Sequence, residues 1–278
     1  MKLALLLLVI VSSLADPQER PGADHESLVA ERKKQIGEQK KNQQTAVEKA
    51  RANVLAEPNS AEGHFQLADA LSKGTITRNI SEEIERAYST AIQLKPDYAE
   101  AFLGLATIRG IWSKGEGQLE ALERAILLKP DYAEAYCNLG FFHLGRIIGK
   151  EPGVDIKGQA KLAAGTFTIA LGIKSDLGEA LMGLGVSNEY LGKYSESVEA
   201  FKKALLLNPS DFLSHAMFGG VYVELGDKQA AAEEYDALLQ LGKKLDLELE
   251  AMGNSEAPNL AKAYADHLLK EIQMRFKK

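Results

Sequence analysis

The segment Lys95-Pro96-Asp97-Tyr98-Ala99-Glu100-Ala101 (KPDYAEA) recurs unchanged at residues 129–135. A degenerate copy, KSDLGEA, occupies residues 174–180, and the turn alone recurs as EPNS at 57–60 and NPSD at 208–211. Self-similarity at a period of roughly 20–50 residues indicates an array of small structural units rather than a single globular core.

The turn markers lie at positions 58, 96, 130, 175 and 209, so their spacings are 38, 34, 45 and 34 residues. Two spacings are equal, and the other two contain insertions of 4 and 11 residues. Proline cannot continue a helix and restricts the residue before it, so each marker ends a helix. The Asp or Ser that follows the proline is suited to cap the next helix.

Between the markers, the apolar residues have helical spacing. One face of residues 180–188 carries Ala180, Leu181, Leu184 and Gly185, and one face of residues 197–205 is equally apolar. Gly192 stands between these two segments, where a tight turn is needed. Each period therefore predicts two antiparallel helices.

This pattern resembles the tetratricopeptide repeat (TPR) family over roughly residues 58–241. The family places a small residue at position 8 of each repeat, an aromatic one at position 24 and a small one at position 27. Position 8 is Ala68, Ala106, Gly140, Gly185 and Gly219, and position 24 is Tyr88, Leu122, Phe167, Phe201 and Tyr235. Gln118 at position 20 and Ser175 in place of proline depart from the pattern.

The resemblance implies an all-α TPR superhelix (an α-α solenoid) of five repeats, with capping helices at both ends. We expect the repeats at about residues 61–94, 99–128, 133–173, 178–207 and 212–241. Residues 45–57 fit a degenerate capping half-repeat, and residues 243–278 fit C-terminal capping helices. The charged segment 16–44 is expected to be partly disordered or helical, and whether it covers the groove of the array stays open.

The N-terminus has the pattern of a secretory signal peptide. Met1-Lys2 precedes the apolar run Leu3–Val11, and Ser13 and Ala15 place small residues before a cleavage point at Asp16. We therefore expect residues 1–15 to be removed and the mature protein to be periplasmic or secreted, without a stable membrane span. The Asn79-Ile80-Ser81 sequon leaves open whether Asn79 is glycosylated.

Composition gives no reason to expect a nucleic-acid partner. Apolar residues make up 45% of the 278 residues, and the formal net charge of −6 becomes 32 − 39 = −7 after removal of the signal segment. A mildly acidic chain lacks the basic face that nucleic acids require. Cys137 is the single cysteine, so no internal disulfide can form.

No sequence signature of catalysis or metal binding is present. The chain contains no HExxH, paired CxxC, GxxxxGK[ST] or GxSxG motif. His64, His143 and His215 occupy packing positions of separate repeats, which indicates structural roles rather than metal ligation. We expect no enzyme activity, no metal and no cofactor.

The resemblance also implies a partner-binding groove lined by the first helix of each repeat. The residues at its contact positions are Phe65, Asp69, Leu103, Thr107, Cys137, Asn138, Phe141, Met182, Val186 and Glu189. Some TPR proteins hold a C-terminal carboxylate with a clamp of basic and amide side chains. That clamp is absent here, and Asn138 is the only residue that partly matches it. The small, apolar lining and the glutamates near its edges (Glu100, Glu134, Glu179, Glu189 and Glu224) favour an apolar, basic protein or peptide segment.

Together these features predict an exported scaffold or adaptor that binds a protein or peptide partner during assembly of cell-envelope or secreted complexes. The alternative is a non-catalytic accessory or spacer subunit of a larger enzyme or secretion machine. Mutation of the groove would separate the two, because a spacer does not use that surface.

Overall fold

The computed structural model describes residues 24–112, 117–149, 152–253 and 259–276. Within these residues the chain forms twelve α-helices and no strand, which confirms the all-α prediction. The signal segment 1–15 and residues 16–23 lie outside the described residues. The helices are α2 (His25–Ala56), α3 (Ala61–Ser72), α4 (Arg78–Leu94), α5 (Ala99–Trp112), α6 (Gln118–Leu128), α7 (Ala133–Ile148), α8 (Ile156–Ile173), α9 (Gly178–Tyr190), α10 (Tyr194–Leu207), α11 (Phe212–Leu225), α12 (Lys228–Ala251) and α13 (Leu260–Arg275).

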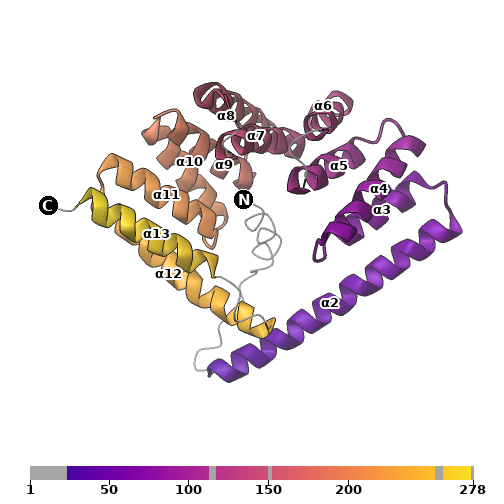
Figure 1. Ribbon diagram of the computed structural model, residues 1–278, viewed down its shortest axis with the longest axis horizontal. Coiled ribbons are helices and arrows are strands. Elements are labelled where there is room, and N and C mark those ends of the chain that lie inside the picture. The colour runs from indigo at the N-terminus through magenta and orange to yellow at the C-terminus, as the bar shows by residue number, and fades with distance from the viewer. Residues whose placement is uncertain (1–23, 113–116, 150–151, 254–258, 277–278) are drawn as a thin grey trace.

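Consecutive helices from α3 to α12 pack as five antiparallel pairs that follow a curve (Figure 1). Helices α5, α7, α9 and α11 face the inside of the curve, and α6, α8 and α10 form its outer side. Helix α12 continues to Ala251, ten residues past the expected end of the fifth repeat at 241. Helix α13 then packs against both α11 and α12, so it closes the C-terminal end of the array.

The turns between repeats have a common backbone structure. The N–H groups of Lys95, Lys129 and Lys174 each donate to the carbonyl four residues earlier, at 2.8–2.9 Å. The turn at Lys174 is the same although Ser175 replaces proline, because the preceding helix has already ended. Gly192 adopts a φ of +73° in its turn, a backbone conformation that suits glycine.

Capping follows the prediction at some turns and not at others. The side chains of Ser60 and Asp211 accept hydrogen bonds from the first turns of α3 and α11. Asp131 does not cap α7, since Tyr132 occupies the N-cap position without a side-chain bond. There the ammonium of Lys129 lies 4.4 Å from the centre of the Tyr132 ring, and Lys95 lies at the same distance from Tyr98.

The core is divided along the array, and aromatic rings fill the space beside glycines. Phe167 and Phe201 are fully buried. A Cβ on Gly140 would come within 2.6 Å of the Phe167 ring, and one on Gly185 within 2.8 Å of Phe201. Glycine at position 8 therefore lets the ring at position 24 approach the backbone of its partner helix.

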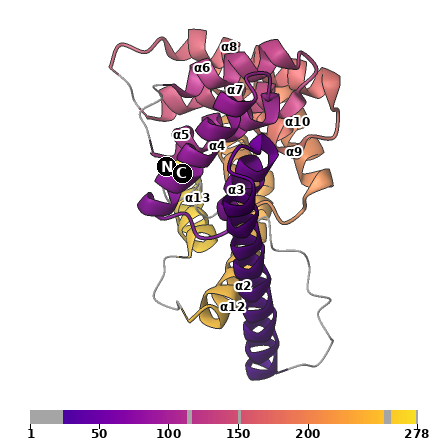
Figure 2. The ribbon, with the colours of Figure 1, turned by 90° about the vertical axis from the view of Figure 1, so that its right-hand side faces the viewer.

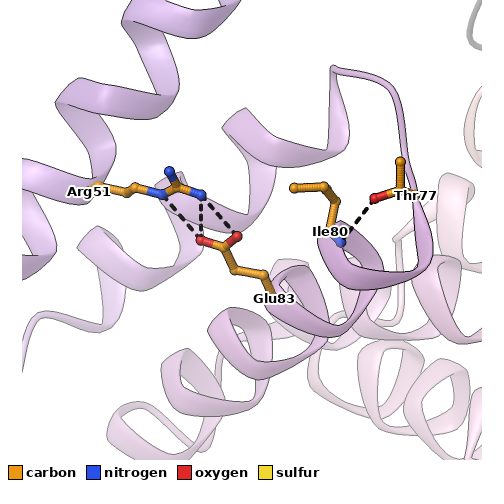
Figure 3. A network of polar contacts seen from close by, with 4 residues as sticks. All are labelled: Arg51, Thr77, Ile80 and Glu83. Carbon is orange, nitrogen blue, oxygen red and sulfur yellow. Dashed lines mark hydrogen bonds and ion pairs between the residues drawn. The ribbon is translucent and has the colours of Figure 1, made fainter.

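Helix α2 differs from its expected form. Residues 25–56 make one continuous helix, where the sequence analysis divided a segment 16–44 from a half-repeat 45–57. Its C-terminal half packs against α3, and Arg51 reaches α4 through a bidentate contact with Glu83, at 2.9 Å from Arg51 Nη2 to each carboxylate oxygen (Figure 3). In the same view the Thr77 side chain accepts a hydrogen bond from the Ile80 N–H at the start of α4.

The N-terminal end of α2 reaches the far end of the array and packs against α12 (Figures 1 and 2). Arg32 Nε donates to Glu248 Oε2 at 2.7 Å, and both side chains are buried. Val29 is buried one turn earlier, and His25 lies 2.9 Å from Glu250. Helix α2 therefore joins the two ends of the curve into a closed ring and does not lie along the inner helices.

Asn79 lies in the first turn of α4 with its side chain exposed, whereas the sequence analysis placed it in an insertion loop. Among the helices that the structure describes, none has both the length and the apolar character needed to cross a membrane.

Candidate partner-binding surface

Four successive inner helices each carry a half-buried apolar side chain at a position that the sequence analysis assigned to the groove. They are Phe65 on α3, Leu103 on α5, Phe141 on α7 and Met182 on α9. Phe65 packs between Tyr88 and Tyr98, with ring centres at 5.8 and 4.9 Å. Phe141 meets Phe167 edge-on at 5.0 Å. These rings are held in place by the core behind them and keep part of their surface accessible.

Two of the ten expected groove residues belong to the core. Cys137 is 1% exposed and Val186 is also buried, so neither side chain can contact a partner directly. Burial, followed by the charges of Glu179 and Glu134, raises the pKa of the Cys137 thiol, which keeps it protonated. Cys137 is therefore an inert packing residue, as the sequence analysis expected of a thiol inside a helix.

The polar side chains at three of the expected groove positions have partners within the chain. Asn138 Nδ2 on α7 donates to Thr107 Oγ1 on α5 at 3.1 Å, which links two successive repeats across the inner surface. Asp69 on α3 pairs with Lys73, the residue that follows the helix, with 2.6 Å between oxygen and nitrogen. The first contact links α5 to α7, and both contacts reduce the polar groups that remain to be satisfied by a partner.

The glutamates at the edge of the groove fall into two groups. Lys129 Nζ lies 3.3 Å from Glu100 Oε1, and Lys174 Nζ lies 3.1 Å from Glu134 Oε1. In both pairs the lysine belongs to the turn that ends the same repeat, so Glu100 and Glu134, in the second and third repeats, each have a cation beside them. The repeat that follows has Asn208 in place of that lysine, and Glu179 lacks the equivalent pairing by sequence.

The second group consists of Glu179 and Glu189, whose surroundings disfavour a negative charge. Burial raises the pKa of Glu179, and the charges of Asp211 and Glu134 add to the effect. Burial, then the charges of Glu271 and Glu224, raises the pKa of Glu189 to about 7. Glu189 therefore lies in a site that favours an approaching cation, since a positive charge would stabilise its carboxylate.

The histidines of the inner helices have structural contacts. The Nε2 groups of His64 and His215 donate to the carbonyls of Pro58 and Pro209, at 2.9 and 3.1 Å, so the same contact recurs in two repeats. His143 Nδ1 lies 2.8 Å from Gln159 Oε1 on the paired helix. Over the described part of the chain, no group of three or more His, Cys, Asp or Glu residues is arranged to hold a metal ion.

The contact between α2 and α12 was not predicted from the sequence. Val29 and Arg32 lie one turn apart on α2, and Glu248 and Leu249 lie on the last turn of α12. The weak apolar pattern of residues 25–44 gave no signal of a distant partner, because Val29 and Arg32 are its only buried side chains among these residues. The pairing could be found only after the curvature of the array placed these ends together.

Comparisons with known proteins agree with this architecture. The model of the tetratricopeptide repeat family matches residues 178–211, which span α9, α10 and the turn that follows. A comparison of the sequence with curated proteins finds no match.

Solved structures of TPR proteins have a similar fold. PilW, described as a type IV pilus biogenesis factor, is 18% identical, with a TM-score of 0.56 over 78% of this chain and 94% of its own. YrrB, described as a TPR protein with an unusual peptide-binding site, is 18% identical, with a TM-score of 0.52 over 75% of this chain and all of its own. The Cut9–Hcn1 assembly gives a TM-score of 0.61 at 18% identity, over 85% of this chain and 44% of that chain. The chain thus contains a recognised tetratricopeptide repeat at 178–211 and has the fold of the TPR solenoids.

Proposed function

We propose that this chain is an exported scaffold that binds a protein or peptide segment on its inner surface, in the assembly of cell-envelope or secreted complexes. The observation that carries the proposal is the row of Phe65, Leu103, Phe141 and Met182, one half-buried apolar side chain per repeat on a rigid support. Such a row suits a segment that places apolar side chains at successive repeats.

The electrostatics of the groove favour a particular kind of partner. The glutamates of the first repeats are paired with lysines, whereas Glu179 and Glu189 lie in sites that disfavour their own charge. A lysine or arginine of the partner near these two residues would supply the missing positive charge. We propose an apolar segment with a basic residue toward the α9–α11 end, bound without a cofactor and without catalysis.

Two solved structures with a similar fold support a role in protein binding. YrrB is described as having a peptide-binding site and PilW as a factor in pilus biogenesis. Export rests on the sequence pattern of residues 1–15 alone. Fusion of residues 1–20 to a reporter enzyme that is active only outside the cytoplasm tests export, and an inactive reporter would contradict it.

The groove is tested with a partner captured by cross-linking in the extracytoplasmic fraction. Met182→Glu should weaken binding at least tenfold, because it places a charge in the apolar row, while Leu206→Glu on the outer side of α10 should leave binding unchanged. Binding that is equally strong in both variants would contradict use of the groove and favour the spacer alternative. Titration calorimetry of the purified pair measures both dissociation constants.

A further inference from the structure

An open cleft of about 710 Å³ lies between the outer helices α8 and α10. Within the described residues, each of these helices packs against α9 but not against the other. Leu181, Leu184 and Asn188 of α9 form the floor of the cleft, because residues three and four apart lie on one side of a helix. Since α8 and α10 form the outer side of the curve, the cleft opens there and not on the inner surface (Figure 1).

Asn188 is the eleventh residue of the fourth repeat, a position whose polar side chains are paired in the two preceding repeats. In the second repeat this residue is Arg109, whose Nε lies 2.7 Å from Glu85 Oε1 on α4. In the third it is His143, whose Nδ1 lies 2.8 Å from Gln159 Oε1 on α8. In both repeats the side chain thus binds an adjacent outer helix.

The first and fifth repeats fill this position with a larger apolar group. Leu71 is 5% exposed, and the Tyr222 ring packs against Phe218 with 4.4 Å between ring centres. Asn188 is shorter than tyrosine and is 7% exposed, yet its side chain forms no hydrogen bond with any residue that the structure describes. No described side-chain nitrogen or oxygen is both fully enclosed and without a partner, so the Asn188 amide must be open to the cleft.

The amide of Asn188 selects the chemistry of a ligand. Its oxygen accepts hydrogen bonds and its nitrogen donates them, so a complementary group must do both. The main chain of an extended peptide presents a free N–H and a free C=O side by side. A helix pairs these groups internally, and an anion such as phosphate only accepts, so neither satisfies the amide as well.

The dimensions and the lining of the cleft suit a short extended segment. Its lining residues run from Ala164 to Leu171 on α8 and from Glu196 to Lys203 on α10. Each stretch covers about two helical turns, or roughly 10 Å at about 1.5 Å per residue. Three extended residues at about 3.3 Å each have the same length. The small residues Ala164, Gly165 and Ala200 leave room for a side chain above the two leucines of the floor.

We propose that this cleft binds an extended peptide segment of a partner protein. One main-chain peptide group pairs with the Asn188 amide, and one aliphatic side chain packs on Leu181 and Leu184. Glu199 and Lys203 lie one turn apart on the α10 side and form no ion pair with any described residue, so both are available to charged residues that flank the bound segment. This site goes beyond the proposed binding on the inner surface and leaves that surface free for a second segment.

Random heptapeptides displayed on phage and selected on the mature chain supply the probe, and fluorescence anisotropy measures the dissociation constants of the selected peptides. We expect a class of peptides that Asn188→Leu weakens at least tenfold, since leucine keeps the volume and loses both hydrogen bonds. The same peptides should bind equally well to Met182→Glu, so the result does not depend on the inner surface. Absence of any such class, or selected peptides that bind Asn188→Leu and the unchanged chain equally, would overturn the proposal.

Methylation of the peptide main chain, one nitrogen at a time, tests the pairing with Asn188. Methylation at one position should weaken binding at least tenfold, because it removes the N–H that the amide oxygen accepts. A peptide that tolerates methylation at every position would contradict this pairing. In the free chain, Asn188→Leu should raise the urea midpoint of unfolding, because an amide buried without a partner costs stability. A lowered midpoint would show that the fold itself needs Asn188 and would overturn its role as a binding residue.

Discussion

The interfaces between repeats and the contact that closes the ring are built from different interactions. Between repeats, a fully buried ring such as Phe201 fills the space left by a glycine, and each helix pair is supported on both sides. At the closure, α2 meets α12 through Val29 and the buried pair of Arg32 and Glu248. Apolar packing adds stability with every repeat, whereas a buried ion pair contributes little net stability and depends on both partners. We therefore expect the closure to open more readily than the contacts between repeats.

The largest expected effect is on the packing between repeats. Phe201→Ala should lower the free energy of unfolding by about 3–5 kcal/mol, the usual cost of emptying a buried aromatic site. Urea titration followed by circular dichroism measures it. Leu206→Ala, on the same helix but exposed, serves as the control and should cost less than about 0.5 kcal/mol. A loss under about 1 kcal/mol for Phe201→Ala would contradict its place in the core.

The next largest effect is on the closure. Glu248→Ala leaves the Arg32 guanidinium buried without its carboxylate, so the end of α2 should detach rather than the whole array unfold. We expect amide exchange in residues 25–36 to accelerate at least tenfold, with a larger radius of gyration in X-ray scattering and a loss of at most about 1–2 kcal/mol in global unfolding. The double variant Arg32→Met/Glu248→Leu should restore protection. Unchanged exchange in Glu248→Ala would show that the ring does not depend on this pair.

A smaller effect, which depends on pH, is expected at Glu189. Its pKa is raised to about 7 in the folded chain, above the ordinary value of 4.5, so folding is favoured below pH 4.5 and this advantage is lost as pH rises through 7. Glu189→Gln should therefore stabilise the protein by about 1–2 kcal/mol at pH 8 and by much less at pH 4.5. Urea titrations at the two pH values check this. Equal stabilisation at both would contradict a titrating Glu189.

The smallest effect is expected at the pair of His215 and Glu234, which links the two helices of the fifth repeat at 2.5 Å. Burial opposes the positive charge of His215, but the hydrogen bonds with Glu234 and the Pro209 carbonyl raise its pKa above 6.5. The pair therefore stabilises the fold fully below pH 6.5 and loses this effect as pH rises through the folded pKa. Glu234→Gln should cost about 1 kcal/mol at pH 6 and little at pH 9. A cost that does not change with pH would contradict the assignment.

The repeated turns could be predicted because each depends on a few neighbouring residues. Proline ends a helix wherever it occurs. The packing of Phe201 beside Gly185 follows from their spacing within one repeat. Capping was predicted less well, since Tyr132 rather than Asp131 occupies the N-cap of α7. The choice between two adjacent residues depends on where the chain turns, and the local sequence permits both.

For the groove residues, the sequence predicted positions within each repeat but not how far each side chain is buried. Their positions within the repeat were assigned through the family resemblance, but the pattern could not separate Cys137 and Val186, which are buried, from Phe141 and Met182, which remain half-accessible. Likewise the edge glutamates looked equivalent in sequence. Only the fold shows that Glu134 lies beside Lys174, forty residues away, while Glu189 lies near Glu271.

The sequence by itself determined the all-helical array, the number of its repeats and the aromatic-on-glycine packing, because these follow from interactions within one repeat and between adjacent ones. The tertiary structure alone decided that α2 spans the ring to pair Arg32 with Glu248, and which glutamates have a lysine beside them. These features depend on the accumulated curvature of all the repeats, which brings distant residues together and which no short stretch of sequence specifies.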